Sequence, residues 1–204
     1  MTARFSNGET VEDRVTSPGL GSGPIVIVPY DSAWPALFRA VADPIRLALG
    51  DVAVRIDHIG STAVPELAAK PVIDVQVSVR EFEPLAPFRD PLVALGYVFR
   101  GDNPERTKRY FREAPGTRRT HIHVRRAGSW NEQFALLFRD FLRAHPDVAG
   151  DYAELKTGLA HEHSLSGLNR HAYVEAKQPF IWATMARADE WAQVTGWEPG
   201  ASDA

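Results

Sequence analysis

Short apolar runs separated by turn-forming residues dominate the first part of the chain. The clearest run, residues 72–79, alternates strictly, with one apolar face (Ile73, Val75, Val77, Val79) and one polar face (Asp74, Gln76, Ser78). Such alternation is typical of a half-buried strand, so we expect the apolar face to meet the core and the polar face to stay open. Similar runs predict further strands at residues 25–28, 54–59, 97–100, 107–113 and 118–125. Because Ala-Pro-Gly-Thr at 114–117 is turn-forming, the last two strands should make an antiparallel hairpin.

Helical periodicity marks the remaining segments. A helix is expected from about residue 34 to Gly50, with a kink or break at Pro44, and a shorter one at residues 84–95. From Trp130 onward the apolar spacing becomes helical throughout, which predicts helices at 130–145, from 146 through 159, and at 173–194, the last kinked by Pro179. This order predicts an α+β fold, in which a mixed β-sheet flanked by helices is followed by a helical carboxyl-terminal half.

Composition narrows the class of protein. The 204 residues include 23 Lys and Arg against 26 Asp and Glu, a net charge of −3 that argues against a wholly basic nucleic-acid binder. The absence of cysteine excludes disulfides, thiolate metal sites and a cysteine nucleophile, and it suits a cytoplasmic location. No apolar stretch is long enough to span a membrane. We expect a flexible leader at residues 1–23, a single domain at 24–197 and a disordered tail at 198–204.

The densest group of chemically useful residues lies between residues 58 and 76. A glycine allows a ligand to approach the backbone closely, and the hydroxyls and amides of Ser61 and Thr62, after Gly60, suit phosphate oxygens. Asp74, on the polar face of its strand, can hold a hard cation that bridges to the same phosphates. The alternative is that Gly60-Ser61 is only a turn and that Asp74 pairs with Lys70 or an arginine.

The chain resembles the GrpB family in several separated motifs. These are 28–34 (VPYDSAW), 58–65 (HIGSTAVP), 69–74 (AKPVID), 121–124 (HIHV), 138–143 (FRDFLR) and 152–156 (YAELK). The resemblance implies the nucleotidyltransferase superfamily, whose fold is a mixed β-sheet with flanking helices. It also implies a Gly-Ser turn followed by an Asp-x-Asp or Asp-x-Glu pair that binds a divalent cation. Some members are fused to dephospho-CoA kinase, which suggests a link to CoA metabolism.

Carried over to this sequence, Gly60 and Ser61 match the Gly-Ser turn and Asp74 the first carboxylate, but Gln76 replaces the second. A glutamine supplies a neutral oxygen, so a single carboxylate should bind Mg²⁺ weakly unless substrate phosphates complete the shell. No acidic residue lies in the strand 118–125, where His121 and His123 project from one face. Together with Asp74 they are the candidate catalytic and metal-binding residues. The cation would be Mg²⁺ or Mn²⁺, with Zn²⁺ less favoured; alternatively, the histidines bind phosphates or backbone groups.

A basic hairpin supplies further candidates. Eight Lys or Arg residues lie between 106 and 126, opposed only by Glu113, and this surface can attract an anion or be a solvated edge. The candidate phosphate- or nucleotide-binding residues are Gly60, Ser61, Thr62, Lys70, Gln76, Arg109, Arg112 and Arg119. The expected partner is a nucleotide or another phosphorylated small molecule, with RNA not favoured and no membrane involved.

Three functions remain open. The first is nucleotide binding with a divalent cation, with or without transfer of a nucleotidyl group to an unknown acceptor. The second is a non-catalytic accessory module that binds a ligand or partner in CoA metabolism. The third is a metal-dependent hydrolase that uses the histidines and Asp74.

Overall fold

The computed structural model describes residues 25–166 and 170–204. The expected leader at 1–23 lies outside these residues. None of the helices in the described ranges is both long and apolar enough to cross a membrane.

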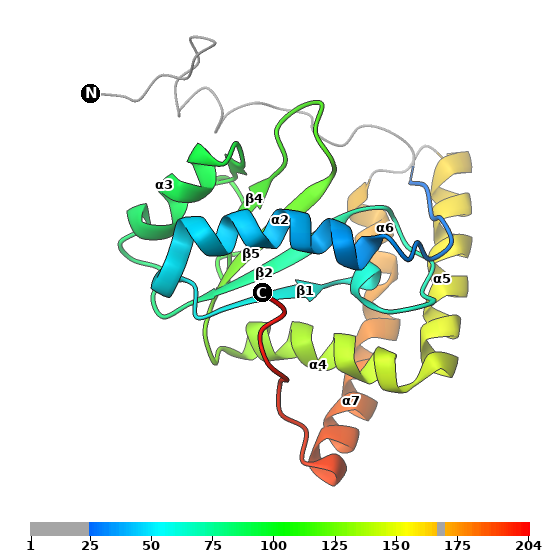
Figure 1. The fold of residues 1–204 in the computed structure, drawn as a ribbon. Coiled ribbons are helices and arrows are strands. Elements are labelled where there is room, and N and C mark those ends of the chain that lie inside the picture. Colours follow the sequence, from blue (N-terminus) through cyan, green and yellow to red (C-terminus); the bar gives the residue numbers. More distant parts are fainter. Residues whose placement is uncertain (1–24, 167–169) are drawn as a thin grey trace.

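A five-stranded mixed sheet forms the centre of the molecule (Figure 1). Its strands occur in the order β1-β2-β5-β4-β3, where only the pair β2 and β5 is parallel. Their bounds are Arg55–Ile59 for β1, Ile73–Val79 for β2, Val98–Phe99 for β3, Arg109–Arg112 for β4 and Thr120–Arg126 for β5. The predicted hairpin is confirmed, since β4 and β5 pair antiparallel. The strand predicted at 25–28 is wrong: that segment forms a single bridge between Val28 and Ala69.

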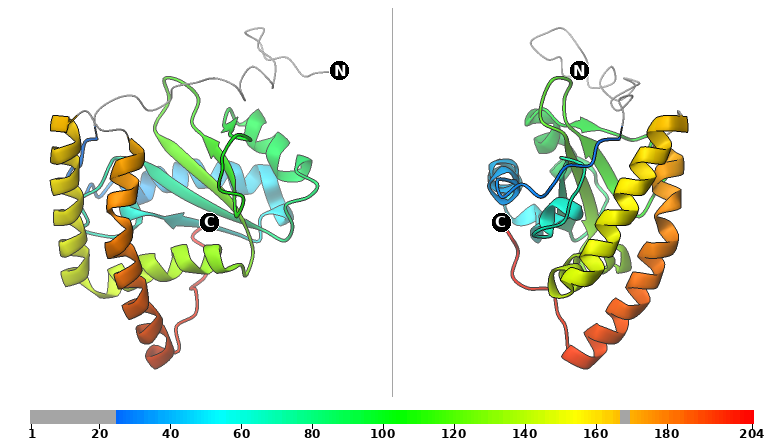
Figure 2. Two further views of the ribbon diagram at one scale, coloured as in Figure 1. Left: turned by 180° about the vertical axis from the view of Figure 1, so that it is seen from behind. Right: turned by 90° about the vertical axis from the view of Figure 1, so that its right-hand side faces the viewer.

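Helices cover both faces of the sheet. One face carries α2 (Trp34–Leu49) and α3 (Ala86–Ala94), with short 3₁₀ turns at Gly50–Val52 and Ser61–Ala63. The four later helices lie on the opposite side, as the right-hand view in Figure 2 shows: α4 (Trp130–Ala144), α5 (Pro146–Ser166), α6 (Arg170–Ala176) and α7 (Gln178–Thr195). The predicted architecture, a mixed sheet flanked by helices with a helical second half, is therefore confirmed.

Prolines affect two helices differently from one another. Helix α2 continues through Pro44 without a break, because Pro44 and Ala40 both face solvent and the carbonyl that loses its hydrogen bond can be hydrated. The single helix predicted at 173–194 is divided at Lys177, two residues before Pro179, which then occupies the first turn of α7.

Both faces of the sheet are buried, one by apolar side chains and the other by a layer that includes polar and charged ones. Val75, Val77 and Ile122 pack against α2 and α3 in the main apolar core. On the other face, Gln76 and Ser78 are also fully buried, which corrects the expectation of an open face. The cover is α4, whose buried side includes the charged residues Glu132 and Arg139. Gln76 Nε2 donates to the main-chain oxygen of Glu132, so only the start of β2, at Asp74, is left partly exposed.

The last residues differ from the expected disordered tail, because residues 202–204 dock on the outer edge of β1. The backbone amides of Asp203 and Ala204 donate to the carbonyl oxygen of Ile56, and Ser202 Oγ accepts from its amide. Asp203 Oδ2 accepts hydrogen bonds from the His58 amide and from Arg139 Nη1, each at 2.9 Å. The physical reason is that an edge strand presents unpaired amides and carbonyls, which a polar segment can satisfy.

Replacing Asp203 tests this docking. Asp203→Ala removes one partner of Arg139, whose side chain is only 3% exposed, and we expect the free energy of unfolding to fall by about 1–3 kcal/mol. Urea denaturation followed by circular dichroism measures it. Glu198→Ala, an exposed change in the same segment, is the control and should leave the midpoint unchanged; equal effects of the two would contradict the docking.

Candidate functional site

Three side chains from two strands meet at the start of β2. Because β2 and β5 are parallel and in register, Asp74 lies directly opposite His121, and Gln76 opposite His123. Asp74, His121 and His123 therefore project from the same face. Asp74 Oδ1 lies 3.1 Å from His121 Nδ1 and 3.3 Å from His123 Nε2. The predicted convergence of these three residues is thus present in the geometry; we call them the Asp74 cluster.

Burial and hydrogen bonding set the charges of the cluster. Burial alone would raise the pKa of Asp74, but the hydrogen bonds to His121 and His123 outweigh it and hold the pKa well below its usual range. Burial lowers the pKa of His123 to about 4, despite the opposing effect of Asp74. Asp74 is therefore an anion and His123 a neutral imidazole near pH 7. A neutral imidazole is the form that binds metals.

The cluster fits a transition-metal cation. One ligand atom from each residue lies within 4.8 Å of the others, so modest rotation of the side chains brings all three to one ion. Two imidazoles and one carboxylate are a donor set for Mn²⁺ or Zn²⁺, whereas Mg²⁺ prefers oxygen ligands. Such a cation would act as a Lewis acid toward a phosphoryl oxygen.

The Gly60 turn approaches the cluster closely. Gly60 follows β1 with φ 72° and ψ −173°, a conformation essentially restricted to glycine. A Cβ atom at this position would lie 2.7 Å from Asp74 Oδ2, so the missing side chain leaves the room that the carboxylate occupies. Ser61 begins the 3₁₀ turn immediately afterwards. The sequence-predicted Gly60 is therefore brought to Asp74, and Ser61 follows it directly in the turn.

Thr62 and Gln76 are held away from the partly exposed end of the site. The Thr62 hydroxyl is buried; it donates to the Val72 carbonyl and lies 3.0 Å from His58 Nε2. His58 in turn stacks on Phe38 on the core side of the sheet. Gln76 is fully buried under α4. A structural role accounts for both side chains.

The arginines of the hairpin separate into two groups. Arg112 lies opposite His121 in the β4–β5 ladder and forms an ion pair with Glu113 at 3.0 Å, and Arg119 reaches the same carboxylate at 3.4 Å. These two arginines are thus beside the Asp74 cluster. Arg109, by contrast, is not brought to it.

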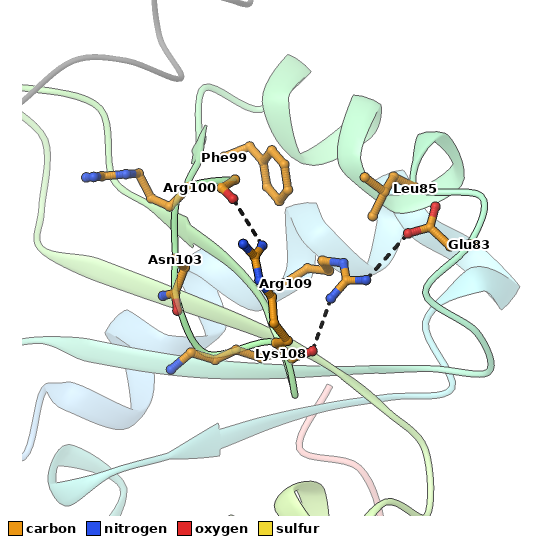
Figure 3. Close-up of a pocket in the computed structure, with 9 residues that line it drawn as sticks. Glu83, Leu85, Phe99, Arg100, Asn103, Lys108 and Arg109 are labelled. Carbon is orange, nitrogen blue, oxygen red and sulfur yellow. Dashed lines mark hydrogen bonds and ion pairs between the residues drawn. The ribbon is translucent and has the colours of Figure 1, made fainter.

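Arg109 lies on the opposite face of the sheet, stacked over Phe82 and 3.4 Å from Glu83. There it lines a separate cavity of about 310 Å³ at the edge formed by β3 and the loop that follows it (Figure 3). Other residues lining this cavity are Leu85, Phe99, Arg100, Asn103, Arg106 and Lys108.

Two lysines near the Asp74 cluster, Lys156 and Lys177, were not predicted from the sequence, and they lie close to the predicted Lys70. The ammonium group of Lys70, a predicted ligand, lies 4.8 Å from the centre of the Tyr173 ring, and Lys177 lies 4.7 Å from the same centre. Lys156 is buried nearby on α5. Lys156 could have been noticed, because it occupies a helix position where the pattern otherwise places apolar residues. No spacing of residues in the sequence indicated Lys177.

Gly60→Ala should damage the site more than a matched change elsewhere. The alanine adopts a strained backbone and displaces the Asp74 carboxylate, so we expect a loss of about 1–3 kcal/mol of stability together with weaker Mn²⁺ binding in calorimetry. Gly116→Ala is the control, because Gly116 also has a positive φ of 79° but open space around its Cβ position. Equal Mn²⁺ affinity in the two variants would contradict the close approach.

His58 should make stability depend on pH. Burial lowers its pKa to about 4, so between pH 6.5 and 4 the unfolded chain binds a proton that the folded protein does not, and stability falls as the pH falls through that range. One proton corresponds to a slope of about 1.4 kcal/mol per pH unit. His58→Asn should reduce the slope of wild type by that amount in urea titrations at pH 5 and 6. His161→Asn, on the exposed side of α5, is the control for the same substitution outside the core.

Comparison with known proteins places the chain in a family. It matches the GrpB protein family over residues 24–187. It is 36% identical to the UPF0157 protein YqkA of Bacillus subtilis, over 82% of this chain and 48% of that protein. It is also 36% identical to the dephospho-CoA kinase of Mycobacterium tuberculosis, over 88% of this chain and 50% of the kinase. The chain therefore spans about half the length of these curated relatives.

A crystal structure of the conserved protein GrpB from Enterococcus faecalis has a TM-score of 0.72 with this chain at 32% identity, covering 81% of this chain and 99% of that one. The Cid1 poly(U) polymerase bound to MgATP aligns at a TM-score of 0.48 and 15% identity, a likeness too weak to argue from. The family match covers most of the chain and agrees with the motifs at residues 58–65, 69–74 and 121–124, so this chain belongs to the GrpB family.

Proposed function

We propose that this protein binds a nucleotide or another phosphorylated small molecule together with a divalent cation at the Asp74 cluster. The observation that carries the proposal is the meeting of Asp74, His121 and His123 beside the Gly60 turn. Each part suits one part of such a ligand: the carboxylate and imidazoles suit the cation, and the turn suits phosphate oxygens.

The charges around the cluster support an anionic ligand. Arg112 and Arg119 share the buried carboxylate of Glu113, so two guanidinium groups lie on this side of the cluster. Tyr110 lies opposite His123 in the β4–β5 ladder, and its ring centre is 5.6 Å from that of His121 and 5.3 Å from that of His123. A cation at Asp74 adds to this positive field and attracts phosphate.

Transfer of a nucleotidyl group is the finer form of the proposal. In that reaction the acceptor hydroxyl would attack the α-phosphate of a nucleoside triphosphate and pyrophosphate would leave. His121 or His123, whichever imidazole is not bound to the cation, would take the hydroxyl proton, while the cation screens the charge on the phosphate. A single carboxylate with two imidazoles holds one cation rather than two. Binding is therefore better supported than transfer.

A non-catalytic accessory module is the second candidate. The burial of Gln76 under α4 favours it, because the position of the second carboxylate is then closed to a ligand. The match to half of a dephospho-CoA kinase makes CoA and dephospho-CoA suitable test ligands.

Asp74→Asn tests the common part of both candidates. We expect wild type to bind Mn²⁺ and to bind ATP, UTP or dephospho-CoA more tightly with Mn²⁺ than without it. The asparagine variant should lose at least about tenfold in Mn²⁺ affinity, because the anionic ligand is removed. Titration calorimetry gives both affinities. Asp31→Asn, an exposed residue before α2, is the matched control.

A separate assay distinguishes transfer from binding alone. Wild type incubated with Mn²⁺, α-labelled nucleotide and a cell extract should label an acceptor if transfer occurs, and Asp74→Asn should label none. Ligand binding without any labelling would favour the accessory module. Absence of both Mn²⁺ and nucleotide binding in wild type would reject the proposed function.

A further inference from the structure

Three of the four lysines of the chain gather in one place. The lysines are Lys70, Lys108, Lys156 and Lys177, and all but Lys108 come together around two tyrosines. They belong to segments far apart in the sequence: the loop before β2, the middle of α5, and the junction of α6 and α7. The remaining basic residues of the protein are arginines, so this grouping does not follow from the general composition.

The tyrosine rings hold the lysines together. The ammonium groups of Lys70 and Lys177 lie 4.8 Å and 4.7 Å from the centre of the Tyr173 ring. Lys156 Nζ lies 4.6 Å from the centre of the Tyr152 ring and donates to the carbonyl oxygen of Ala68 at 2.6 Å. Cation–π contacts stabilise ammonium groups without neutralising them.

The group lies at the end of the sheet where β2 begins, with Lys156 buried and Lys70 and Lys177 partly buried. Figures 1 and 2 show α5 and α6 side by side at this end. Lys156 is 3% exposed and Tyr173 is fully buried. Within residues 25–166 and 170–204, the Tyr173 hydroxyl has no hydrogen-bond partner, although it is buried. A buried donor without a partner among these residues is costly, and a bound acceptor would relieve that cost.

The three lysines repel one another electrostatically. Burial, together with the charges of Lys177 and Lys70, lowers the pKa of Lys156 to about 7. Burial and Lys70 likewise lower the pKa of Lys177 to about 8, against the opposing effect of Asp74. Among the described residues, neither Lys156 nor Lys177 forms an ion pair with an Asp or Glu. An anion is the missing charge.

We propose that Lys70, Lys156, Lys177 and the Tyr173 hydroxyl form a binding site for a chain of phosphate groups, adjacent to the Asp74 cluster. The inference rests on the proposed function for the identity of the whole ligand, since it assigns the phosphate chain of a nucleotide to this site. The adjacency follows from the chain itself, because Lys70 lies in the loop that leads into β2, four residues before Asp74. The charge of Asp74 also acts on Lys177 and Tyr152. A cation at Asp74 and ammonium groups opposite it would contact the same phosphates from two sides.

Inorganic triphosphate in metal-free buffer isolates this site from the cation. Titration calorimetry with EDTA present should show binding to wild type. Lys156→Met and Lys177→Met should each weaken it by roughly tenfold or more, because each removes a charge-assisted hydrogen bond. Arg39→Met, which removes one exposed charge from α2 on the other side of the sheet, should change the affinity much less.

Proton uptake on ligand binding is a measurement that a purely structural role of Lys156 would not change. Near its pKa Lys156 is partly neutral, and a bound anion favours the charged form, so binding should take up protons. Lys70 and Lys177 act on the charge of Lys156, and Tyr152 lies under its ammonium group. Asp74 on β2 acts on Lys177 and Tyr152, and Tyr173 acts on Tyr152. Calorimetry at pH 7 in buffers of different ionisation enthalpy measures the uptake. Lys156→Arg should bind triphosphate but take up fewer protons. Because wild type and variant bind the same ligand, the protons exchanged by the ligand itself are equal and cancel in the difference.

The outcomes separate this inference from the proposed function. Asp74→Asn should lose Mn²⁺ yet keep triphosphate affinity, because it removes a negative charge near Lys177. If wild type binds Mn²⁺ and nucleotide but not triphosphate, or if folded Lys156→Met and Lys177→Met both bind triphosphate as wild type does, the lysine site is overturned and the Asp74 site stands. Triphosphate binding without Mn²⁺ binding would support the lysine site and reject the cation site.

Discussion

The parallel pairing of β2 with β5 is the constraint on which the candidate site depends. It sets Asp74 opposite His121 and places His123 one side-chain repeat further along the same face. A shift of one residue between the strands would turn the histidines to the apolar core and bring Ile122 to Asp74. The flanking antiparallel pairs, β1 with β2 and β4 with β5, fix this register from both sides.

The helices that cover the polar face of the sheet leave β2 partly exposed only at its start, where the candidate site lies. Helix α4 covers the middle of the sheet with polar as well as apolar groups: Glu132 contacts Gln76, and Arg139 donates to the His58 carbonyl and to Asp203. At the start of β2 the neighbouring helices are α5 and α6, which supply lysines and tyrosines instead. The chemistry therefore changes along one face, from a closed polar layer to a cationic group beside Asp74.

Local patterns predicted the elements well where packing is regular. The alternation at 72–79, the Pro-Gly turn at 114–117 and the helical spacing after Trp130 all correspond to elements of the fold. The exceptions depend on contacts between distant segments. Residues 25–28 resemble a strand but form only one bridge, and Gln76 has a polar side chain yet is buried, because α4 covers it and accepts a hydrogen bond from its Nε2.

The same division holds for the site. Asp74, His121 and Gly60 could be found because each belongs to a recognisable local motif. Lys156 and Lys177 could not, because only the arrangement of α5, α6 and α7 brings them together. Arg109 illustrates the opposite case: its place in a basic run suggested the site, but strand parity directs it to the other face.

The docked segment 202–204 also bears on how the molecule behaves in a crowded solution. A sheet exposes hydrogen-bonding groups at its two outermost strands, where a second molecule can add a strand and start aggregation. Here Ser202, Asp203 and Ala204 occupy the groups of Ile56 on β1, and the opposite margin is β3, only two residues long. Both edges of the sheet are therefore poor templates for self-association. A chain that lost the docked segment would expose the edge of β1 and become prone to aggregate there, even with its candidate site intact.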